Sequence, residues 1–409
     1  MKKISVFLFL ASVMFFGCSH PAPKVIQSRK ITWYKEPFLQ LNGEVGEIFE
    51  NGLCQVENNK LYGLIDFEGN FQLEPVACEP VTKIGLIPVR RGYKTGLINQ
   101  KGDTIYPCKA NNFLYLNASF YTLDTDEGAL IFKEDGSQLK TTCPLSDAWG
   151  KFNDKMLAVE VWVGDKTKSA RTYIDTAGNC LPGKYRRTEI FQNGIAAVIT
   201  EDNKHQYIDK KGNVVFECPE EWTEAYSFKG PLALISISGK GYGFINKQFK
   251  IIVEPQYSTN MAANDNFYVV SKAVGEKELM GAIDTTGETI IPLKFGYVKK
   301  FTTDKCIVSN PKPERETKDG EVFDVEALEA LFKEGIYDTR QQLLIVPYQY
   351  DNLENAGNDI LLAKTKGTYE YLYENGKSLS NMKFEKAGKF YKNRAWVKQN
   401  GKWGIIQLQ

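Results

Sequence analysis

The chain has 409 residues, 43% hydrophobic and 12% aromatic, and its 51 Lys and Arg residues nearly balance 50 Asp and Glu residues. This length can bury a large core, and the neutral charge balance argues against nucleic-acid binding, which needs a basic face. Only two histidines occur, and no G-x-S-x-G or H-E-x-x-H motif accompanies them. We therefore expect no enzyme, no catalytic residue and no cofactor.

The N-terminus has the pattern of an export signal. Met1–Lys3 is basic, and Ile4–Phe16 is an apolar run too short to span a bilayer as a stable anchor. Residues 1–17 are therefore predicted to be a cleaved signal peptide.

The next residues predict a lipid anchor. Gly17-Cys18 resembles the end of a bacterial lipobox, so Cys18 is the expected lipid attachment site. Phe15 and Phe16 depart from the usual Leu and small residue, and a plain secretory signal is the alternative. Residues 18–35 then form a polar tether. No later apolar stretch approaches spanning length, so we expect membrane contact through the lipid alone. The expected location is the bacterial cell envelope, with the outer membrane favoured and its side left open.

A short motif returns about every 35 residues through the predicted array, residues 36–409. It consists of an aromatic or small residue, Gly, two aliphatic residues and Asp or Asn. A convenient ruler is the aliphatic or aromatic residue before the Asp or Asn position, which gives about ten copies, at Ile65, Ile98, Ile131, Ile174, Ile208, Ile245, Ile283, Tyr337, Leu372 and Ile406. Such a period is typical of solenoids, propellers and other repeat arrays.

Each copy continues into a hairpin turn. Asp or Asn at the first turn position can bond the backbone two residues later, and a Gly three residues later accepts a positive φ. The residues to which we assign this structural role are Gly63, Asp66, Gly69, Gly96, Asn99, Gly102, Asp175, Gly178, Asp209, Gly212, Gly243, Asn246, Gly281, Asp284, Gly287, Trp403 and Gly404. One Asp per turn is too few oxygen ligands for calcium, so no metal site is expected.

The remainder of each copy is also β-like. An aliphatic return strand ends in Pro, as in Phe71–Pro75 and Ile251–Pro255, and a third run follows, as in Phe191–Val198. Proline cannot donate to a strand ladder and so marks where pairing stops. Each unit is therefore predicted to contain two or three short strands.

These motifs resemble the WG-repeat family. The last copy, Gly401–Ile406, contains the Trp-Gly pair, and Pro347–Asp351 is similar to the middle of the family's unit. Most other copies replace Trp, and Phe249 and Gln341 stand where the turn Gly is expected. The resemblance covers roughly residues 45–409 and implies a repetitive β-structure with an interaction-type role.

Two segments lengthen the array. The ruler spacing between Ile131 and Ile174 is wide, with Val159–Trp162 predicted as a strand and Gly164–Lys168 as its turn. A second insertion, near 311–334, contains a predicted helix that begins at Asp324. Insertions in repeat proteins often carry binding faces, so residues 311–334 are a candidate partner site, against the alternative of a surface decoration.

Seven cysteines remain besides Cys18, and none forms a C-x-x-C pair. Their spacing argues against a zinc cluster, and most are expected to pack as small apolar side chains. One or two disulfides are left open.

The sequence thus predicts an all-β array in which an open solenoid is preferred over a propeller, because about ten units exceed the usual blade number. The expected function is binding or scaffolding in the envelope, through an unknown protein partner. The alternative is a carbohydrate-binding lipoprotein that uses exposed aromatic residues on the repeat face.

Overall fold

The computed structural model describes residues 29–49, 51–81, 85–117, 120–258, 260–264, 267–275, 277–311 and 332–409. The regular elements of these residues are all strands, without a helix. Accordingly, this part of the chain has no helix suited to crossing a membrane. The signal peptide, Cys18 and most of the predicted insertion at 311–334, with its helix, lie outside the described residues.

The strands of the first half, in chain order, are β1 (Ile31–Leu39), β2 (Val45–Ile48), β3 (Cys54–Asn58), β4 (Leu61–Ile65), β5 (Phe71–Ala77), β6 (Ile87–Arg91), β7 (Lys94–Ile98), β8 (Thr104–Ala110), β9 (Asn112–Asn117), β10 (Phe120–Thr125), β11 (Gly128–Lys133), β12 (Leu145–Ala148), β13 (Met156–Val163), β14 (Lys168–Asp175), β15 (Tyr185–Thr188), β16 (Ile195–Thr200), β17 (His205–Asp209) and β18 (Val214–Glu217). Those of the second half are β19 (Trp222–Lys229), β20 (Leu232–Ile237), β21 (Gly241–Asn246), β22 (Ile251–Tyr257), β23 (Asn260–Asn264), β24 (Phe267–Val274), β25 (Lys277–Ile283), β26 (Thr289–Phe295), β27 (Tyr297–Lys300), β28 (Lys305–Ser309), β29 (Glu334–Asp338), β30 (Leu343–Tyr350), β31 (Asn352–Gly357), β32 (Ile360–Thr365), β33 (Thr368–Tyr373), β34 (Lys386–Ala387), β35 (Arg394–Gln399) and β36 (Lys402–Leu408).

Hydrogen bonding groups these strands into nine antiparallel sheets. The seven-stranded sheet consists of two groups joined by a single pair, Arg171 with Tyr185, so we count ten units among the described residues. In chain order, units 1 to 10 are β2–β5, β6–β8, β9–β11, β12–β14, β15–β18, β19–β22, β23–β26, β27–β30, β31–β33 and β34–β36 with β1. One ruler residue falls in each unit, and each unit has three or four strands, where two or three were predicted.

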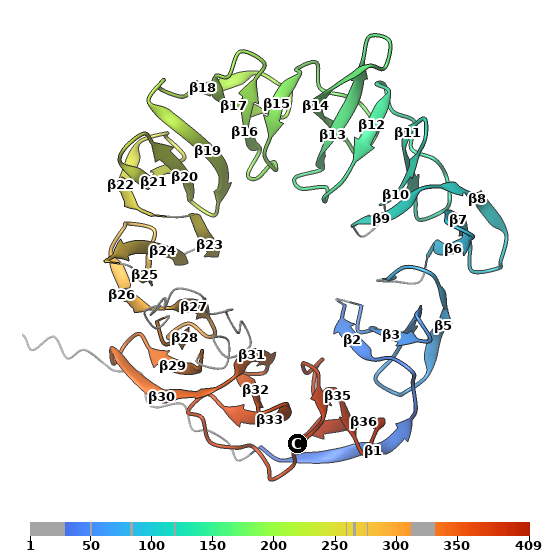
Figure 1. Ribbon diagram of the computed structural model, residues 1–409, viewed down its shortest axis with the longest axis vertical. Coiled ribbons are helices and arrows are strands. Elements are labelled where there is room, and N and C mark those ends of the chain that lie inside the picture. The colour runs from blue at the N-terminus through green and yellow to red at the C-terminus, as the bar shows by residue number, and fades with distance from the viewer. Residues whose placement is uncertain are drawn as a thin grey trace, which may run out of the picture.

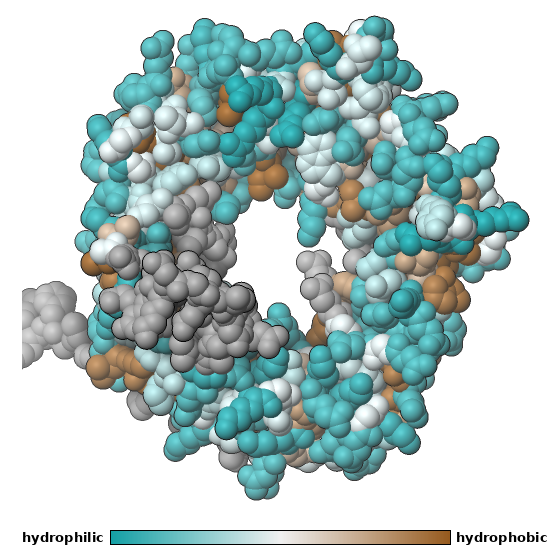
Figure 2. Space-filling model, in the orientation of Figure 1, coloured by the Kyte–Doolittle hydropathy of each residue, from teal (hydrophilic) through white to brown (hydrophobic). Residues whose placement is uncertain are grey.

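The units form a closed ring around an open centre (Figure 1). The last strand of a four-stranded unit, such as β5, β22 or β30, lies at the perimeter, and the first strand, such as β2 or β23, lies toward the middle. The space-filling view shows an opening through the centre and a mostly hydrophilic surface (Figure 2). The arrangement is therefore propeller-like.

Apolar clusters between units account for the closure. Buried hydrophobic residues form ten clusters, and each cluster draws its residues from two consecutive units. The cluster that joins unit 10 to unit 1 places Trp403 and Ile405 against Val56 and Ile65. Because this cluster joins the last unit to the first, the array has no free apolar end face.

The predicted open solenoid was therefore wrong. Spacing along the chain sets the size of a unit, but the small rotation between neighbouring units decides whether an array curves back on itself. Ten units form a ring here by leaving the centre open (Figure 2). The usual blade number of propellers was therefore a poor criterion for deciding between an open solenoid and a closed ring.

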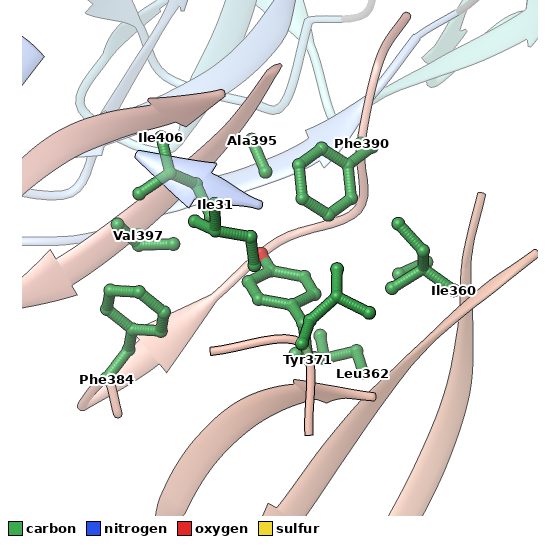
Figure 3. Packing of buried hydrophobic residues seen from close by; sticks show 11 residues of the cluster. Ile31, Ile360, Leu362, Tyr371, Phe384, Phe390, Ala395, Val397 and Ile406 are labelled. Atoms are coloured by element: carbon green, nitrogen blue, oxygen red, sulfur yellow. The ribbon is translucent and has the colours of Figure 1, made fainter. Parts of the chain in front are cut away.

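Strand β1 completes unit 10. It pairs antiparallel with β36 from Ile31 opposite Leu408 to Leu39 opposite Trp403. Figure 3 shows Ile31 among residues of units 9 and 10, including Tyr371 and Ile406. The array thus begins at residue 31 and includes residues that the sequence analysis assigned to the tether.

A repeated irregularity confirms that β1 is an outer strand of the repeat. In unit 1, Gly63 of β4 alone faces three residues of β5, Glu74 to Val76, because the register shifts between Tyr62 and Leu64. In unit 10, Gly404 faces Glu36 to Phe38 of β1 in the same way. Both bulges contain a proline, and such bulges bend a strand where pairing is interrupted.

The motif glycine is required by this close approach. A Cβ on Gly63 would lie 2.4 Å from the carbonyl oxygen of Leu73, and one on Gly243 would lie 2.5 Å from that of Val253. Neither glycine has a positive φ, so lack of space and not backbone conformation excludes a side chain.

Replacing a motif glycine should therefore destabilise the ring. We expect Gly243→Ala to lower the free energy of unfolding by about 1–3 kcal/mol, because the outer strand must move away. The matched control is Gly46→Ala in β2, where the nearest atom to a new Cβ is 3.9 Å away. Urea unfolding followed by circular dichroism measures both variants, and equal stability of the two would contradict the close-approach argument.

Removing apolar volume from β1 tests the closure. Ile31 is 7% exposed, and we expect Ile31→Ala to lower the free energy of unfolding by about 2–4 kcal/mol. Glu36→Ala, at an exposed position of the same strand, should change it by less than about 0.5 kcal/mol. An unchanged unfolding midpoint for Ile31→Ala would show that the ring does not depend on β1.

Candidate functional site

The predicted turn residues bond their own hairpins. Asp66 Oδ1 accepts hydrogen bonds from the backbone N–H groups of Glu68 (2.9 Å) and Asn70 (2.8 Å). Partial burial opposes ionisation of Asp66, but hydrogen bonds from Asn70 and Glu68 outweigh it and lower the pKa of the carboxyl. The same pair of backbone bonds occurs at Asn99, Asp175, Asp209, Asn246 and Asp284.

The fourth residue of each predicted turn is a glycine with a positive φ, with two exceptions. Gly69 has a φ of 81°, and Phe249 takes the corresponding position in unit 6 with a φ of 58°. In unit 8 the positive φ falls at Gln342 and not at Gln341, because that turn is one residue longer. The repeated polar residues thus hold turns, and the described residues contain no group of three or more metal-ligating side chains.

His205 lies in β17 and is partly buried. Burial lowers the pKa of its imidazole, with Glu224 and Arg187 acting in opposite directions. Its buried Nδ1 has no hydrogen-bond partner among the described residues. His20 lies outside them.

The cysteines of the described residues are a disulfide-bonded pair, two buried thiols and three partly buried thiols. Cys143, in the segment before β12, forms a disulfide with Cys180, after β14, with a Cα–Cα distance of 6.0 Å. Cys54 and Cys306 are buried, and burial raises the pKa of each thiol to about 12. These two thiols therefore stay protonated and unreactive at neutral pH.

The exposed aromatic residues do not form a row. Those with a large exposed fraction in the described residues lie on units 10, 2 and 8, and are Tyr34, Phe38, Tyr93 and Tyr297. A continuous aromatic face for a glycan is therefore absent from this part of the chain, and ligand sites must be sought between units.

A pocket of about 700 Å³ lies where units 2, 3 and 4 meet. We call it the Trp162 pocket, and its lining residues include Tyr106, Lys109, Glu127, Lys140, Trp162 and Lys166. This volume is within the range of small-molecule sites, roughly 300–1,000 Å³.

Local structure positions each wall of the Trp162 pocket. Tyr106 comes from the perimeter strand β8, and its ring packs edge-on against Phe132 at 5.9 Å. Partial burial raises the pKa of Tyr106, and the nearby Glu127 and Asp126 carboxylates add to this effect. Trp162 comes from β13, whose backbone N–H at this residue donates to the Pro144 carbonyl at 2.9 Å.

Gly128 of unit 3 allows unit 4 to approach closely at the pocket. It has a φ of 124°, and a Cβ there would lie 2.1 Å from the Leu145 carbonyl oxygen. The Cys143–Cys180 disulfide lies next to Pro144 in sequence and ties this connection to the hairpin after β14. The pocket wall is thus fixed by backbone contact and by a covalent bond.

A second pocket, of about 330 Å³, lies at the junction of units 5, 6 and 7. Its Arg187 guanidinium pairs with Glu189 at 2.9 Å and Glu224 at 2.6 Å, and lies 5.3 Å from the Tyr226 ring. Burial raises the pKa of Glu189 although Arg187 opposes the shift. Because the charges of Arg187 and Glu189 are already paired, this pocket offers less charge to a ligand than the Trp162 pocket.

Sequence reasoning predicted the turns but missed both pockets. The signal nearest to the Trp162 pocket was the lengthened unit between Ile131 and Ile174, whose predicted strand and turn correspond to β13 and the hairpin leading to β14. Tyr106 and Lys109 lie in a different unit from Trp162, so no sequence pattern connects them.

Comparison with solved structures gives distant likenesses. A structure titled as the eukaryotic initiation factor has a TM-score of 0.48 at 13% identity, covering 77% of this chain and 89% of that chain. BamB from Moraxella catarrhalis has a TM-score of 0.32 at 10% identity, covering 73% and 99%. The Dos1 propeller has a TM-score of 0.34 at 10% identity, covering 91% and 95%.

No curated protein matches the sequence. The family model of the WG containing repeat matches residues 207–240, 242–272, 280–310 and 374–403. These segments lie in units 5 to 10, and each includes strands of the ring described above. The chain therefore carries WG repeats at four places.

Proposed function

We propose that this protein is a non-enzymatic binding or scaffolding protein of the bacterial cell envelope. The observation that carries the proposal is that the repeated polar residues stabilise the fold, whereas the pocket contains polar residues that are not part of the repeated motif. The repeated polar residues, such as Asp66 and Asp209, bond their own turns. The polar and aromatic residues of the Trp162 pocket, such as Lys109, Trp162 and Lys166, lie on strands and hairpins of three units and take no part in these turns. Repeat proteins commonly bind partners in this way.

The proposal includes a lipid anchor at Cys18. Twelve residues, Ser19 to Lys30, separate it from β1, which lies at the perimeter of the ring. Fully extended, such a segment reaches about 40 Å, so the anchor would hold the rim of the ring close to the bilayer. The binding surfaces would then face partners within the envelope.

Fractionation of cells tests the anchor. We expect the wild-type protein in the membrane fraction and Cys18→Ser in the soluble fraction, because the acyl chains attach to that sulfur. Cys78→Ser, which changes a partly buried cysteine of the ring, is the control and should stay with the membranes. Retention of Cys18→Ser in the membrane fraction would contradict lipid attachment at this residue.

In-cell photo-crosslinking tests the binding role. A photo-reactive amino acid at Lys140 or Lys229, each beside a pocket, should capture a reproducible partner identified by mass spectrometry. The control position is Tyr93, which is 97% exposed in the hairpin between β6 and β7. A partner captured equally from all three positions would argue against binding at the pockets. A hydrolytic activity abolished by one Asp or Glu substitution would overturn the non-enzymatic role.

Deleting residues 312–331 in the same experiment tests the insertion as a partner site. Loss of the captured partner would assign it to the insertion, whereas unchanged capture would assign it to the ring.

A further inference from the structure

The Trp162 pocket presents three cations without partners. Lys109, Lys140 and Lys166 are among its lining residues and are exposed, and no side chain of the three has a hydrogen bond or ion pair with another described residue. Three ammonium groups around one concave site attract a ligand with a negative charge.

The acidic residues of the pocket reduce this attraction without cancelling it, because three lysines line the pocket with two carboxylates, Asp126 and Glu127. Asp126 accepts a hydrogen bond from the Asn111 side chain at 2.9 Å and lies 3.5 Å from the Lys94 ammonium. Its charge is therefore already compensated from outside the pocket. Glu127 has no such partner among the described residues and can accept hydrogen bonds from ligand hydroxyl groups.

Two aromatic side chains give the pocket apolar surface. Tyr106 and Trp162 both line it and both are partly buried. The Trp162 Nε1–H is buried beside Gly128 and has no acceptor in the described part of the chain. Aromatic faces combined with hydrogen-bonding groups suit a ligand with apolar C–H faces and polar edges.

A saccharide with an acidic group has all three features. We propose that the Trp162 pocket binds an acidic saccharide, whose carboxylate is held by Lys109, Lys140 and Lys166 and whose hydroxyl groups bond Glu127 and Gln138. Its ring faces then pack against Tyr106 and Trp162. This inference rests on the proposed binding function and adds the chemical class of one ligand.

Titration of the purified protein with oligogalacturonate tests the charge requirement. Isothermal titration calorimetry should detect binding that weakens as NaCl is raised, because salt screens exposed charges. The fully methyl-esterified oligosaccharide has the same sugar without the charge and should bind about tenfold more weakly or worse. Polyglutamate, an anion without sugar rings, should compete at least about tenfold more weakly than the saccharide, and equal competition would contradict the role of the sugar rings.

Variants with the same change of charge locate the site. Replacing Lys109, Lys140 and Lys166 with Ala should weaken binding of oligogalacturonate by about tenfold or more, because each removes a charge-assisted hydrogen bond. The matched control replaces three exposed lysines of other units with Ala. These are Lys210, Lys247 and Lys402. This control should bind like the wild type. Trp162→Phe should weaken binding with no change in net charge.

Three results would overturn the proposal: no binding of the acidic saccharide, equal binding of its methyl ester, or equal losses in the two triple-lysine variants. None of these would affect a protein partner captured by crosslinking in cells. Conversely, capture could fail while the purified protein binds oligogalacturonate as expected. The two proposals are therefore tested separately.

Discussion

The packing of each unit against two neighbours is the constraint on which this structure depends. A unit of three or four short strands leaves an apolar surface on each side, and each of the ten clusters contains residues from two consecutive units. An open array would leave two such surfaces exposed to water. Closure buries both, and the β1–β36 pairing fixes the register of the last unit. The ring and its pockets therefore depend on contacts between the two ends of the chain.

The sequence repeat and the structural unit are offset. The matched repeat at residues 207–240 runs from β17 of unit 5 to β20 of unit 6. Each repeat thus belongs to two units and connects them through the chain itself. The same offset leaves unit 10 without an outer strand, which β1 supplies with its Pro37 bulge opposite Gly404. The N- and C-terminal partial units are complementary because each contains the strands that the other lacks.

The residues that repeat from unit to unit mainly stabilise the fold, whereas the pocket depends on residues that do not repeat. The motif glycines allow the outer strand to approach closely, and the turn Asp and Asn residues bond backbone N–H groups, so these positions tolerate little change. Connections between units are free of these constraints. The Trp162 pocket forms at such a connection, where a lengthened hairpin, a disulfide and the perimeter strand of another unit meet. The ring thus holds the exposed residues of the pocket, such as Lys140 and Lys166, on a framework of buried neighbours.

The sequence by itself determined the local structure. Its period, its Asp-x-x-Gly turns and its alternating strands predicted the β-class and one ruler residue in every unit, because these features depend on neighbours along the chain. The tertiary structure alone decided that the array closes, since closure depends on the rotation summed over all units. It also decided the pockets, because Tyr106 and Trp162 come from different units and meet only through packing. The fold alone also decided that β1 pairs with β36, because the two strands lie at opposite ends of the sequence.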